Sequence, residues 1–442
     1  MSTVESSDSP EGANVSQEIR RIAVSVTKDS LRQIRGGHPW VYDGSITRIK
    51  PPSGIDPAEL RAGDIAVIFD DKRRFAAVGL YDPDSPIRVR ILHVGTPRNV
   101  DDEFFAERVA TAAAVRLDHF DDSDTNGFRL VHGENDGLPG LIVDRYADTA
   151  VIKLYSAAWF PHLGSVMASL RRALATAVPS APGSKDLRAI VLRLSRSLGE
   201  PGAGVDTGDG DGATIWGEAP SGPVAFKENG LRFEADVVHG HKTGFFLDQR
   251  DNRRLIRSLA NGKDVIDVFS FSGGFSVSAA AGGARSVHSV DISPWALEAA
   301  ARNVELNRRI GNVRRCRFSS TVGDARRVLD DLAGHRRSVD LVVVDPPSFA
   351  SNARQVSSAI RAYSDLAGQA CALVRPGGTL FQASCSARID RIQLQQAVIE
   401  GAHRAGYSLV DVREYGQPID HPIGFAQGGY LKAITATVLR NR

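Results

Sequence analysis

The chain has 442 residues, which is long enough for two or three domains with separate cores. Its 54 basic and 52 acidic residues nearly balance, so any nucleic-acid-binding surface has to be a local patch. Three cysteines are too few for a disulfide framework, no apolar run could cross a bilayer, and the first residues lack a secretory signal pattern. We therefore expect a cytoplasmic protein with no membrane contact.

The first part of the chain divides into a polar tail and a β-rich segment. Residues 1–18 are rich in Ser, Glu, Asp and Gly, and they predict a disordered tail because they have too little apolar surface to bury. Short alternating apolar runs follow, separated by Pro, Gly and Asp turns. These runs, which predict strands, are residues 22–26, 65–69, 76–80 and 87–92. They indicate a small β domain over residues 19–97.

One turn in this domain, Arg35-Gly-Gly-His-Pro-Trp40, combines cationic and aromatic groups. Arg35 and His38 could contact an RNA phosphate, and Trp40 could stack on a base. The competing interpretation, which composition alone favours, is a simple turn with Trp40 packed in the core.

Residues 98–236 predict a second, α/β domain. Apolar residues recur at helical spacing over 101–118 and 162–177, and strand-like runs occur at 130–132, 140–143, 150–154 and 189–194. A polar turn at residues 132–137 could contact substrate, although a plain hairpin is the favoured interpretation. The loop at 200–212 carries Asp206, Asp209 and Asp211, but Gly217 stands where a calcium loop needs a bidentate Glu. We therefore favour a flexible insertion over a calcium site.

Residues 237–442 predict a third domain of alternating strands and helices. Apolar runs at 264–269, 286–290, 340–344 and 379–383 alternate with helical patterns, which indicates a parallel sheet covered by helices on both faces. No helical pattern separates residues 409–412 from 430–439, so the sheet should end in an antiparallel pair. Ser293 and Pro294 predict the start of the helix that follows the second strand.

The stretch at residues 264–275 has the pattern of a nucleotide-binding corner: an apolar strand, a turn of small residues, and an alanine-rich helix. Two glycines in the turn would let a ligand approach the backbone. A dinucleotide site would show Gly-x-Gly-x-x-Gly, which is absent, so a dehydrogenase is disfavoured. Asp267 suits a ligand with a cationic amine and Asp291 could accept from ribose hydroxyls, a combination that favours S-adenosylmethionine.

Other candidate cofactor residues lie around this corner or just before it. Asp324 is expected just after a further strand of the sheet. Residues 242–250, which precede the first strand of the sheet, could close over the cofactor. The predicted cofactor-binding residues are Lys242, Thr243, Phe245, Gln249, Arg250, Asp267, Phe271, Ser272, Gly273, Asp291, Ile292 and Asp324. His239 and His241 are spaced as metal ligands on a strand, but neither has an evident third partner, so we expect no metal.

The segment Asp345-Pro-Pro-Ser-Phe349 is the candidate site for the methyl acceptor. Pro346 and Pro347 fix the backbone, Asp345 could hold the edge of a nucleobase, and Phe349 could stack on its face. The competing interpretation is a proline turn that ends a strand, with Phe349 in the core.

Cys385 separates two chemistries. An exocyclic amine attacks a sulfonium methyl without a protein nucleophile, whereas C5 of a pyrimidine becomes nucleophilic only after a thiolate adds to C6. Cys385 is flanked by serines at a predicted strand end, which favours the thiolate role. Cys316 and Cys371 are interpreted as buried core residues.

Taken together, these motifs resemble the RlmI-like class I methyltransferases that form 5-methylcytosine in the RNA of the large ribosomal subunit. The resemblance covers the chain from residue 22 onward and includes the six motifs at residues 35–40, 134–140, 242–250, 267–275, 345–349 and 384–386. It implies an N-terminal PUA domain that binds RNA, a central α/β domain, and Cys385 as the nucleophile. Two features depart from the family: Ser348 stands where relatives often carry lysine, and the tail and the 200–212 loop look additional.

The leading hypothesis is a cytosine-C5 methyltransferase that uses S-adenosylmethionine, with 23S rRNA or a large-subunit precursor as its partner. Cys385 would be the nucleophile, and Asp345 would hold the N3 and N4 edge of the base. The alternatives are methylation of a guanine or adenine nitrogen through the Asp345 loop, or an RNA-binding assembly protein with a vestigial site. The oligomeric state stays open, with a homodimer as one option.

Overall fold

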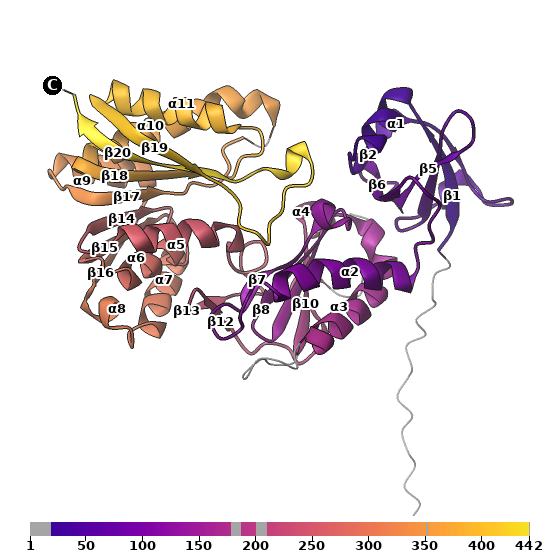
Figure 1. Ribbon diagram of the computed structural model, residues 1–442, viewed down its shortest axis with the longest axis horizontal. Helices are drawn as coiled ribbons and strands as arrows, with labels where there is room; N and C mark the ends of the chain where they lie inside the picture. Colours follow the sequence, from indigo (N-terminus) through magenta and orange to yellow (C-terminus); the bar gives the residue numbers. More distant parts are fainter. Residues whose placement is uncertain (1–18, 178–186, 200–209, 351, 442) are drawn as a thin grey trace, which may run out of the picture. The chain divides into compact units, whose positions relative to one another are not determined.

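The computed structural model describes residues 19–177, 187–199, 210–350 and 352–441 (Figure 1). The predicted tail at 1–18 and residues 200–209 of the predicted insertion lie outside these ranges. The chain forms two compact units, one of Met1–Val100 with Ala157–Gly164, the other of Asp101–Ser156 with Ser165–Arg442.

The first unit contains a six-stranded sheet and the short α-helix α1. Its strands are β1 (Arg21–Val26), β2 (Trp40–Tyr42), β3 (Ile46–Lys50), β4 (Ile65–Phe69), β5 (Phe75–Tyr81) and β6 (Ile87–Val94), in the order β2-β6-β5-β4-β1-β3. Helix α1 (Lys28–Arg35) begins at Thr27, whose side chain accepts from the Ser30 amide. The four predicted strands are confirmed. Strands β2 and β3 are missed by the pattern because they are short and carry exposed polar or aromatic residues.

The second unit opens with a five-stranded sheet, in the order β11-β10-β9-β8-β7. Its elements are α2 (Asp102–Leu117), β7 (Gly127–His132), β8 (Leu141–Tyr146), β9 (Thr149–Leu154), α3 (Leu163–Ala177), β10 (Ala189–Leu194), α4 (Arg196–Gly199) and β11 (Thr214–Gly217). Strands β7 and β8 pair antiparallel across a short helical turn, so the predicted hairpin is confirmed. All residues of β7 and β10 are buried, including the polar side chains of Arg129, His132 and Arg193.

A two-stranded hairpin, β12 (Val224–Glu228) and β13 (Leu231–Ala235), follows this sheet. The side chains of Asn303 and Asn307 accept hydrogen bonds from the backbone of β13, each at 2.9 Å. Phe226 and Phe233 of the hairpin pack against Phe245 with ring centroids 5.1 and 5.2 Å apart. The hairpin therefore shares a core with the elements that follow it.

The last part of the unit is a seven-stranded sheet in the order β16-β15-β14-β17-β18-β20-β19 (Figure 1). The strands are β14 (Asp264–Val268), β15 (Ser286–Asp291), β16 (Arg317–Val322), β17 (Val339–Val344), β18 (Val374–Ser384), β19 (Tyr407–Tyr415) and β20 (Lys432–Arg440). Strands β14 to β18 run parallel to one another, and β20 runs antiparallel to both β18 and β19. This confirms the predicted mostly parallel sheet with its C-terminal antiparallel pair.

Helices cover both faces of this sheet. One face carries α5 (Arg250–Leu259), α6 (Gly274–Ala281), α7 (Pro294–Leu306) and α8 (Gly311–Arg315), and the other carries α9 (Ala325–Gly334), α10 (Val356–Leu373) and α11 (Arg391–Arg404) (Figure 1). Helix α7 begins as predicted, with the Ser293 side chain as cap and Pro294 in the first turn. Strand β16 escaped prediction as an apolar run because it is an edge strand made mostly of exposed and half-buried residues.

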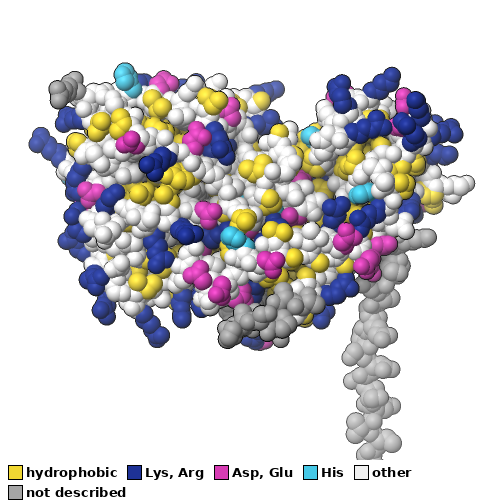
Figure 2. Space-filling view, in the orientation of Figure 1, with side chains coloured by type: hydrophobic (Ala, Val, Ile, Leu, Met, Phe, Trp, Pro, Cys, Tyr) yellow, Lys and Arg dark blue, Asp and Glu magenta, His cyan; other side chains and the backbone are white. Residues whose placement is uncertain are grey.

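Charged side chains of both signs lie on the face of the molecule shown in Figure 2. Lys and Arg side chains, dark blue in Figure 2, are spread over this face of both units. No helix within the described ranges is long and apolar enough to cross a membrane.

Candidate active site

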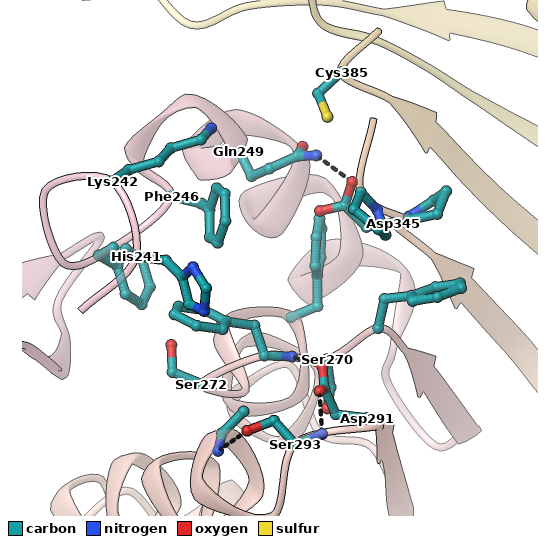
Figure 3. Close-up of a pocket in the computed structure, with 18 of the residues that line it drawn as sticks. His241, Lys242, Phe246, Gln249, Ser270, Ser272, Asp291, Ser293, Asp345 and Cys385 are labelled. Carbon is teal, nitrogen blue, oxygen red and sulfur yellow. Dashed lines mark hydrogen bonds between the residues drawn. The ribbon is translucent and has the colours of Figure 1, made fainter. Parts of the chain in front are cut away.

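A cavity of about 390 Å³ lies at the carboxyl ends of β14, β15, β17 and β18 (Figure 3). The segment that precedes α5 supplies a further wall. The lining residues are His241, Lys242, Phe245, Phe246, Asp248, Gln249, Arg253, Phe269, Ser270, Phe271, Ser272, Gly274, Phe275, Asp291, Ile292, Ser293, Trp295, Ala296, Asp345, Pro346, Pro347, Cys385 and Leu431. Ligands of open α/β sheets bind at this edge, so the cavity is the candidate active site.

The turn after β14 is held in an unusual backbone conformation. Phe269 and Phe271 have φ values of 62° and 47°, in the left-handed region that side chains other than glycine rarely adopt. Gly273 also has a positive φ, of 76°, and a Cβ there would lie 2.7 Å from the Cβ of Ala300. At Gly274 a Cβ would lie 2.9 Å from Arg253. The two glycines make room for neighbouring side chains and helices, and Gly274 also lines the cavity, as an approach of a ligand to the backbone would require.

Asp291 fixes the far wall of the cavity. Its carboxylate accepts from the amide of Phe271 at 2.8 Å and from the amide of Ser293 at 2.9 Å. One side chain thus joins the turn after β14 to the start of α7. Ile292 and Trp295, beside it, keep 70% and 46% of their surface exposed, which is unusual for large apolar groups.

Three buried oxygens in the cavity wall have no hydrogen-bond partner among the described residues. They belong to the hydroxyls of Ser270 and Ser272 and to Oδ1 of Asp248. A buried polar atom without a partner costs about 1–3 kcal/mol, so such atoms usually mark the place of a ligand. Two hydroxyls and a carboxylate oxygen without partners, in a cavity also lined by aromatic rings, fit a polar cofactor such as S-adenosylmethionine.

Asp267 lies behind the cavity and does not line it. Only 1% of the residue is exposed, and its Oδ2 accepts from the Ser276 hydroxyl at 2.6 Å. Burial raises the pKa of Asp267 to about 7, because ionisation in this environment forfeits hydration.

This shifted carboxyl predicts a pH dependence of stability. The pKa of Asp267 in the unfolded chain is near 3.8, so between pH 4 and 7 the folded state binds a proton that the unfolded state has lost. Stability should therefore fall as the pH rises through this interval and level off above it. The variant Asp267→Asn, which keeps the shape and lacks the charge, should show a loss about 3 kcal/mol smaller between pH 5 and 8. Urea unfolding at the two pH values measures this, and equal losses in the two proteins would contradict it.

Lys242 and Asp248 form a charged pair at the mouth of the site. The Lys242 ammonium lies 3.6 Å from Oδ2 of Asp248 and 4.4 Å from the centre of the Phe246 ring. Burial opposes the ionisation of Asp248, but the Lys242 charge holds the pKa of this carboxyl below its ordinary value. In Figure 3 the Lys242 side chain reaches across the cavity toward the side where Cys385 lies.

The five-stranded sheet β11-β10-β9-β8-β7, called the central sheet below, holds the segment at residues 243–245 in place. Thr243 donates to Asp144 of β8 at 2.6 Å, and the Tyr146 hydroxyl is 3.1 Å from the Thr243 hydroxyl. Tyr146 also accepts from the amide of Phe245 at 3.2 Å. All four groups are buried. Thr243 therefore positions the cavity wall and does not itself face the cavity.

Arg250, predicted to bind the cofactor, lies instead in a buried ion pair. Its guanidinium donates twice to the carboxylate of Asp420, at 2.7 and 2.9 Å. Asp420 also accepts from the amide of Arg129 on β7, and His421 lies 3.1 Å from it. The exposed fractions of the Arg250 and Asp420 side chains are 3% and 0%. This pair connects α5, the loop before β20 and the central sheet.

Asp345 and Cys385 face the cavity from adjacent strands, β17 and β18 (Figure 3). The Gln249 side chain donates to Oδ1 of Asp345 at 2.8 Å. Burial raises the pKa of Asp345 to about 7 and, together with nearby carboxylates, the pKa of Cys385 to about 11. Of the charges around the thiol, that of Lys242 acts in the opposite direction and favours the thiolate.

The serines on either side of Cys385 are fully buried and bonded, so the thiol is the group left facing the cavity. Ser384 donates to the Tyr363 hydroxyl at 2.8 Å, and the Ser386 hydroxyl lies 3.0 Å from the same oxygen. The Lys432 ammonium donates to the carbonyl of Ser386 at 2.6 Å. These contacts fix the backbone on which the thiol is carried.

Of the side chains that follow Asp345, some line the cavity and others pack against the core. Pro346 and Pro347 line the cavity, but Phe349 packs against Tyr363 with ring centroids 5.0 Å apart and does not line it. The Ser348 hydroxyl lies 2.9 Å from the Ser386 hydroxyl.

The structure thus brings together most, but not all, of the predicted site. Among the residues predicted to bind the cofactor or the target base, those that do not line the cavity are Thr243, Arg250, Asp267, Gly273, Asp324 and Phe349. Asp324 is exposed and caps α9 through the Arg327 amide. His239 and His241 lie in a turn, so their predicted placement on a strand is wrong. Lining residues that the prediction omitted include Phe246, Asp248 and Trp295; the first two lie inside the 242–250 motif, and Trp295 follows the predicted cap of α7.

Comparisons with known proteins agree with this geometry. A family model described as S-adenosylmethionine-dependent methyltransferase matches residues 207–434, and a model of a PUA-like domain matches residues 24–93. The chain is 43% identical over 418 residues to a Deinococcus radiodurans protein named ribosomal RNA large subunit methyltransferase, covering 94% of this chain and 97% of that protein. It is 33% identical to ribosomal RNA large subunit methyltransferase I of Pseudoalteromonas translucida, covering 92% and 97%.

Solved structures share the fold. A Streptococcus mutans protein named as a methyltransferase of this cofactor class superposes with a TM-score of 0.73 at 17% identity, covering 94% of this chain and 99% of that one. A protein solved in complex with SAH superposes with a TM-score of 0.74 at 18% identity, covering 95% and 100%. The predicted PUA-like domain, fold class and cofactor are confirmed, and the chain belongs to the family of S-adenosylmethionine-dependent methyltransferases that includes ribosomal RNA large subunit methyltransferase I.

Proposed function

We propose that this protein methylates C5 of a cytosine in large-subunit ribosomal RNA, with Cys385 as the covalent nucleophile. The observation that carries the proposal is that Cys385 and Asp345 line the same cavity as the turn after β14, which is predicted to bind the cofactor. A thiol and a carboxyl on neighbouring strands are the two groups that addition to a pyrimidine ring requires.

Cys385 acts first in this proposal. Its thiolate adds to C6 of cytosine, which breaks the C5–C6 double bond and leaves C5 rich in electrons. S-adenosylmethionine supplies an electrophilic methyl group when bound. After C5 has taken the methyl group, a base removes the C5 proton, the double bond forms again and the thiolate leaves. Without the covalent step C5 is too weak a nucleophile.

Asp345 assists the addition by holding the edge of the base. With a pKa of about 7, the carboxyl can donate a proton toward N3 or accept from the N4 amine near neutral pH. Gln249 fixes one of its oxygens and leaves the other for the substrate. A hydrogen bond or proton at N3 withdraws electrons from the ring and favours attack at C6.

Lys242 promotes formation of the thiolate. Its charge lowers the pKa of Cys385, against a larger opposite effect of burial. We assign it this role in addition to cofactor binding.

An RNA substrate is supported by the names of the relatives and by the PUA-like unit. In that unit Arg35 is exposed and lies 3.2 Å from Asp70, while Trp40 is half-buried with its ring 5.6 Å from that of His38. An exposed guanidinium and two aromatic rings packed edge to face, carried on one short segment, suit a phosphate and a neighbouring base. We propose that Arg35, His38 and Trp40 contact RNA.

Analysis of the product tests the proposal. The protein is incubated with protein-free large-subunit RNA and S-adenosylmethionine carrying a labelled methyl group, and the RNA is digested to nucleosides for mass spectrometry. We expect the label in 5-methylcytidine. Label in a methylated guanosine or adenosine would instead support the second candidate, attack by a base nitrogen held at Asp345, Pro346 and Pro347 with no covalent step.

A further inference from the structure

A second cavity, of about 630 Å³, lies at the carboxyl ends of β9 and β10 in the central sheet. Four cationic side chains and one carboxylate line it, together with two histidines and a tyrosine. The charged members are Lys153, Arg193, Arg196, Lys242 and Asp211. We call this cavity the central groove.

The strand register concentrates positive charge in the central groove. Strands β9 and β10 are parallel, and Lys153 pairs with Arg193, so two cations stand side by side. Like charges in this position destabilise a sheet. Asp211 neutralises Arg193, with oxygens 3.0 and 3.4 Å from the guanidinium. The Arg193 side chain is 8% exposed, so this pair belongs to the framework of the groove.

Lys153 forms no ion pair within the described ranges, although the charge of Asp211 acts on it from a greater distance. Its ammonium donates to the carbonyl of Lys242 at 3.2 Å, which is a neutral acceptor, and no carboxylate of the described residues forms an ion pair with it. Burial and the nearby Arg193 charge lower the pKa of Lys153. Arg196, exposed at the start of α4, likewise has no ion-pair partner among the described residues. A bound anion would offset this crowding of cations.

The central groove adjoins the candidate active site. His241 and Lys242 line both cavities. Tyr155, 42% exposed, lies in the groove with its ring 5.9 Å from the Lys153 ammonium. Proteins hold single-stranded RNA by combining cationic side chains, which bind the phosphates, with exposed aromatic rings, on which bases stack.

We propose that the central groove binds the phosphate backbone of single-stranded RNA next to the nucleotide that enters the active site, with Lys153 and Arg196 as phosphate contacts. This inference rests on the proposed function for its choice of RNA as the ligand. It gives the central domain a direct part in substrate binding, in addition to that of the PUA-like unit.

The test compares RNA binding by the full chain and by the double variant Lys153→Gln/Arg196→Gln. Dissociation constants for a short, fluorescently labelled single-stranded RNA of mixed sequence are measured by anisotropy over about 50 to 200 mM salt. Each lost phosphate contact should reduce the slope of log K against log salt by about 0.7, so we expect a reduction of about 1.4. Binding should weaken for every sequence tried.

The control variant Arg314→Gln/Arg315→Gln removes the same charge from α8, which directly precedes the edge strand β16 and does not line the central groove. It should leave the salt slope unchanged. Calorimetry with S-adenosylmethionine verifies that both variants remain folded. A slope for the groove variant equal to that of the control would overturn the inference. Because the readout is binding, it stands whichever base is methylated, so failure here is distinguishable from failure of the cytosine-C5 proposal.

Discussion

Replacing Cys385 with alanine should abolish methylation of cytosine while leaving the affinity for S-adenosylmethionine nearly unchanged. Loss of a covalent nucleophile reduces turnover by about 10⁴-fold or more, because no other group can form the adduct. The cofactor affinity should survive because the polar groups around the turn after β14 stay in place. Labelled methyl transfer measures the first effect and calorimetry measures the second.

Cys316→Ala is the matched control for this prediction. Its thiol is buried beside β15 and β16, away from the cavity, and burial raises its pKa to about 11. It should retain turnover within about twofold of the parent, with at most the small loss of stability expected for a trimmed core residue. Turnover by Cys385→Ala similar to that of Cys316→Ala would exclude the covalent route and favour attack by a base nitrogen.

Replacing Arg250 with methionine should destabilise the larger unit by about 3–5 kcal/mol. The substitution keeps much of the side-chain volume but leaves the Asp420 carboxylate buried without its guanidinium partner, at 0% exposure. The charge must then be neutralised by protonation or remain desolvated, and both are unfavourable at neutral pH. Urea unfolding, followed through the transition of the larger unit, gives the free energy.

An exposed ion pair supplies the comparison for Arg250. Arg308 and Glu305 lie 3.0 Å apart, with 46% and 72% of their side chains exposed. Arg308→Met should change the free energy of unfolding by no more than about 1 kcal/mol. Since Arg250 does not line the cavity, Arg250→Met should also bind S-adenosylmethionine nearly normally at low temperature. A large loss of affinity with little loss of stability would return Arg250 to the cofactor site.

The sequence predicted those features of the fold that depend on local pattern. Short runs containing apolar residues identified β14, β15 and β17, and a cap followed by proline identified the start of α7. Strand-end positions then indicated that Asp291, Asp345 and Cys385 would meet, because the carboxyl ends of parallel strands lie at one edge. The edge strand β16 was anticipated only through Asp324 beyond its end, because its own pattern is largely polar.

Contacts between distant segments could not be predicted in this way. Arg250 and Asp420 are 170 residues apart, and nothing near either residue in the sequence indicates the other. The motif around Arg250 was correctly associated with the cavity, but which of its side chains turn inward depends on the packing of α5. The orientation of Phe349 likewise depends on a contact outside its own motif, because its ring packs against Tyr363.

The hydrogen bonds from Asp144 and Tyr146 to the segment at 243–245 have a consequence for how this enzyme can evolve. One wall of the cofactor cavity is tied to β8, a strand of the central sheet. A seven-stranded methyltransferase domain transplanted without that sheet would leave buried donors and acceptors unsatisfied beside its own cavity. Recombination of the catalytic domain with other RNA-binding modules is therefore constrained to carry the central domain along, whereas the PUA-like unit is not bound by these contacts.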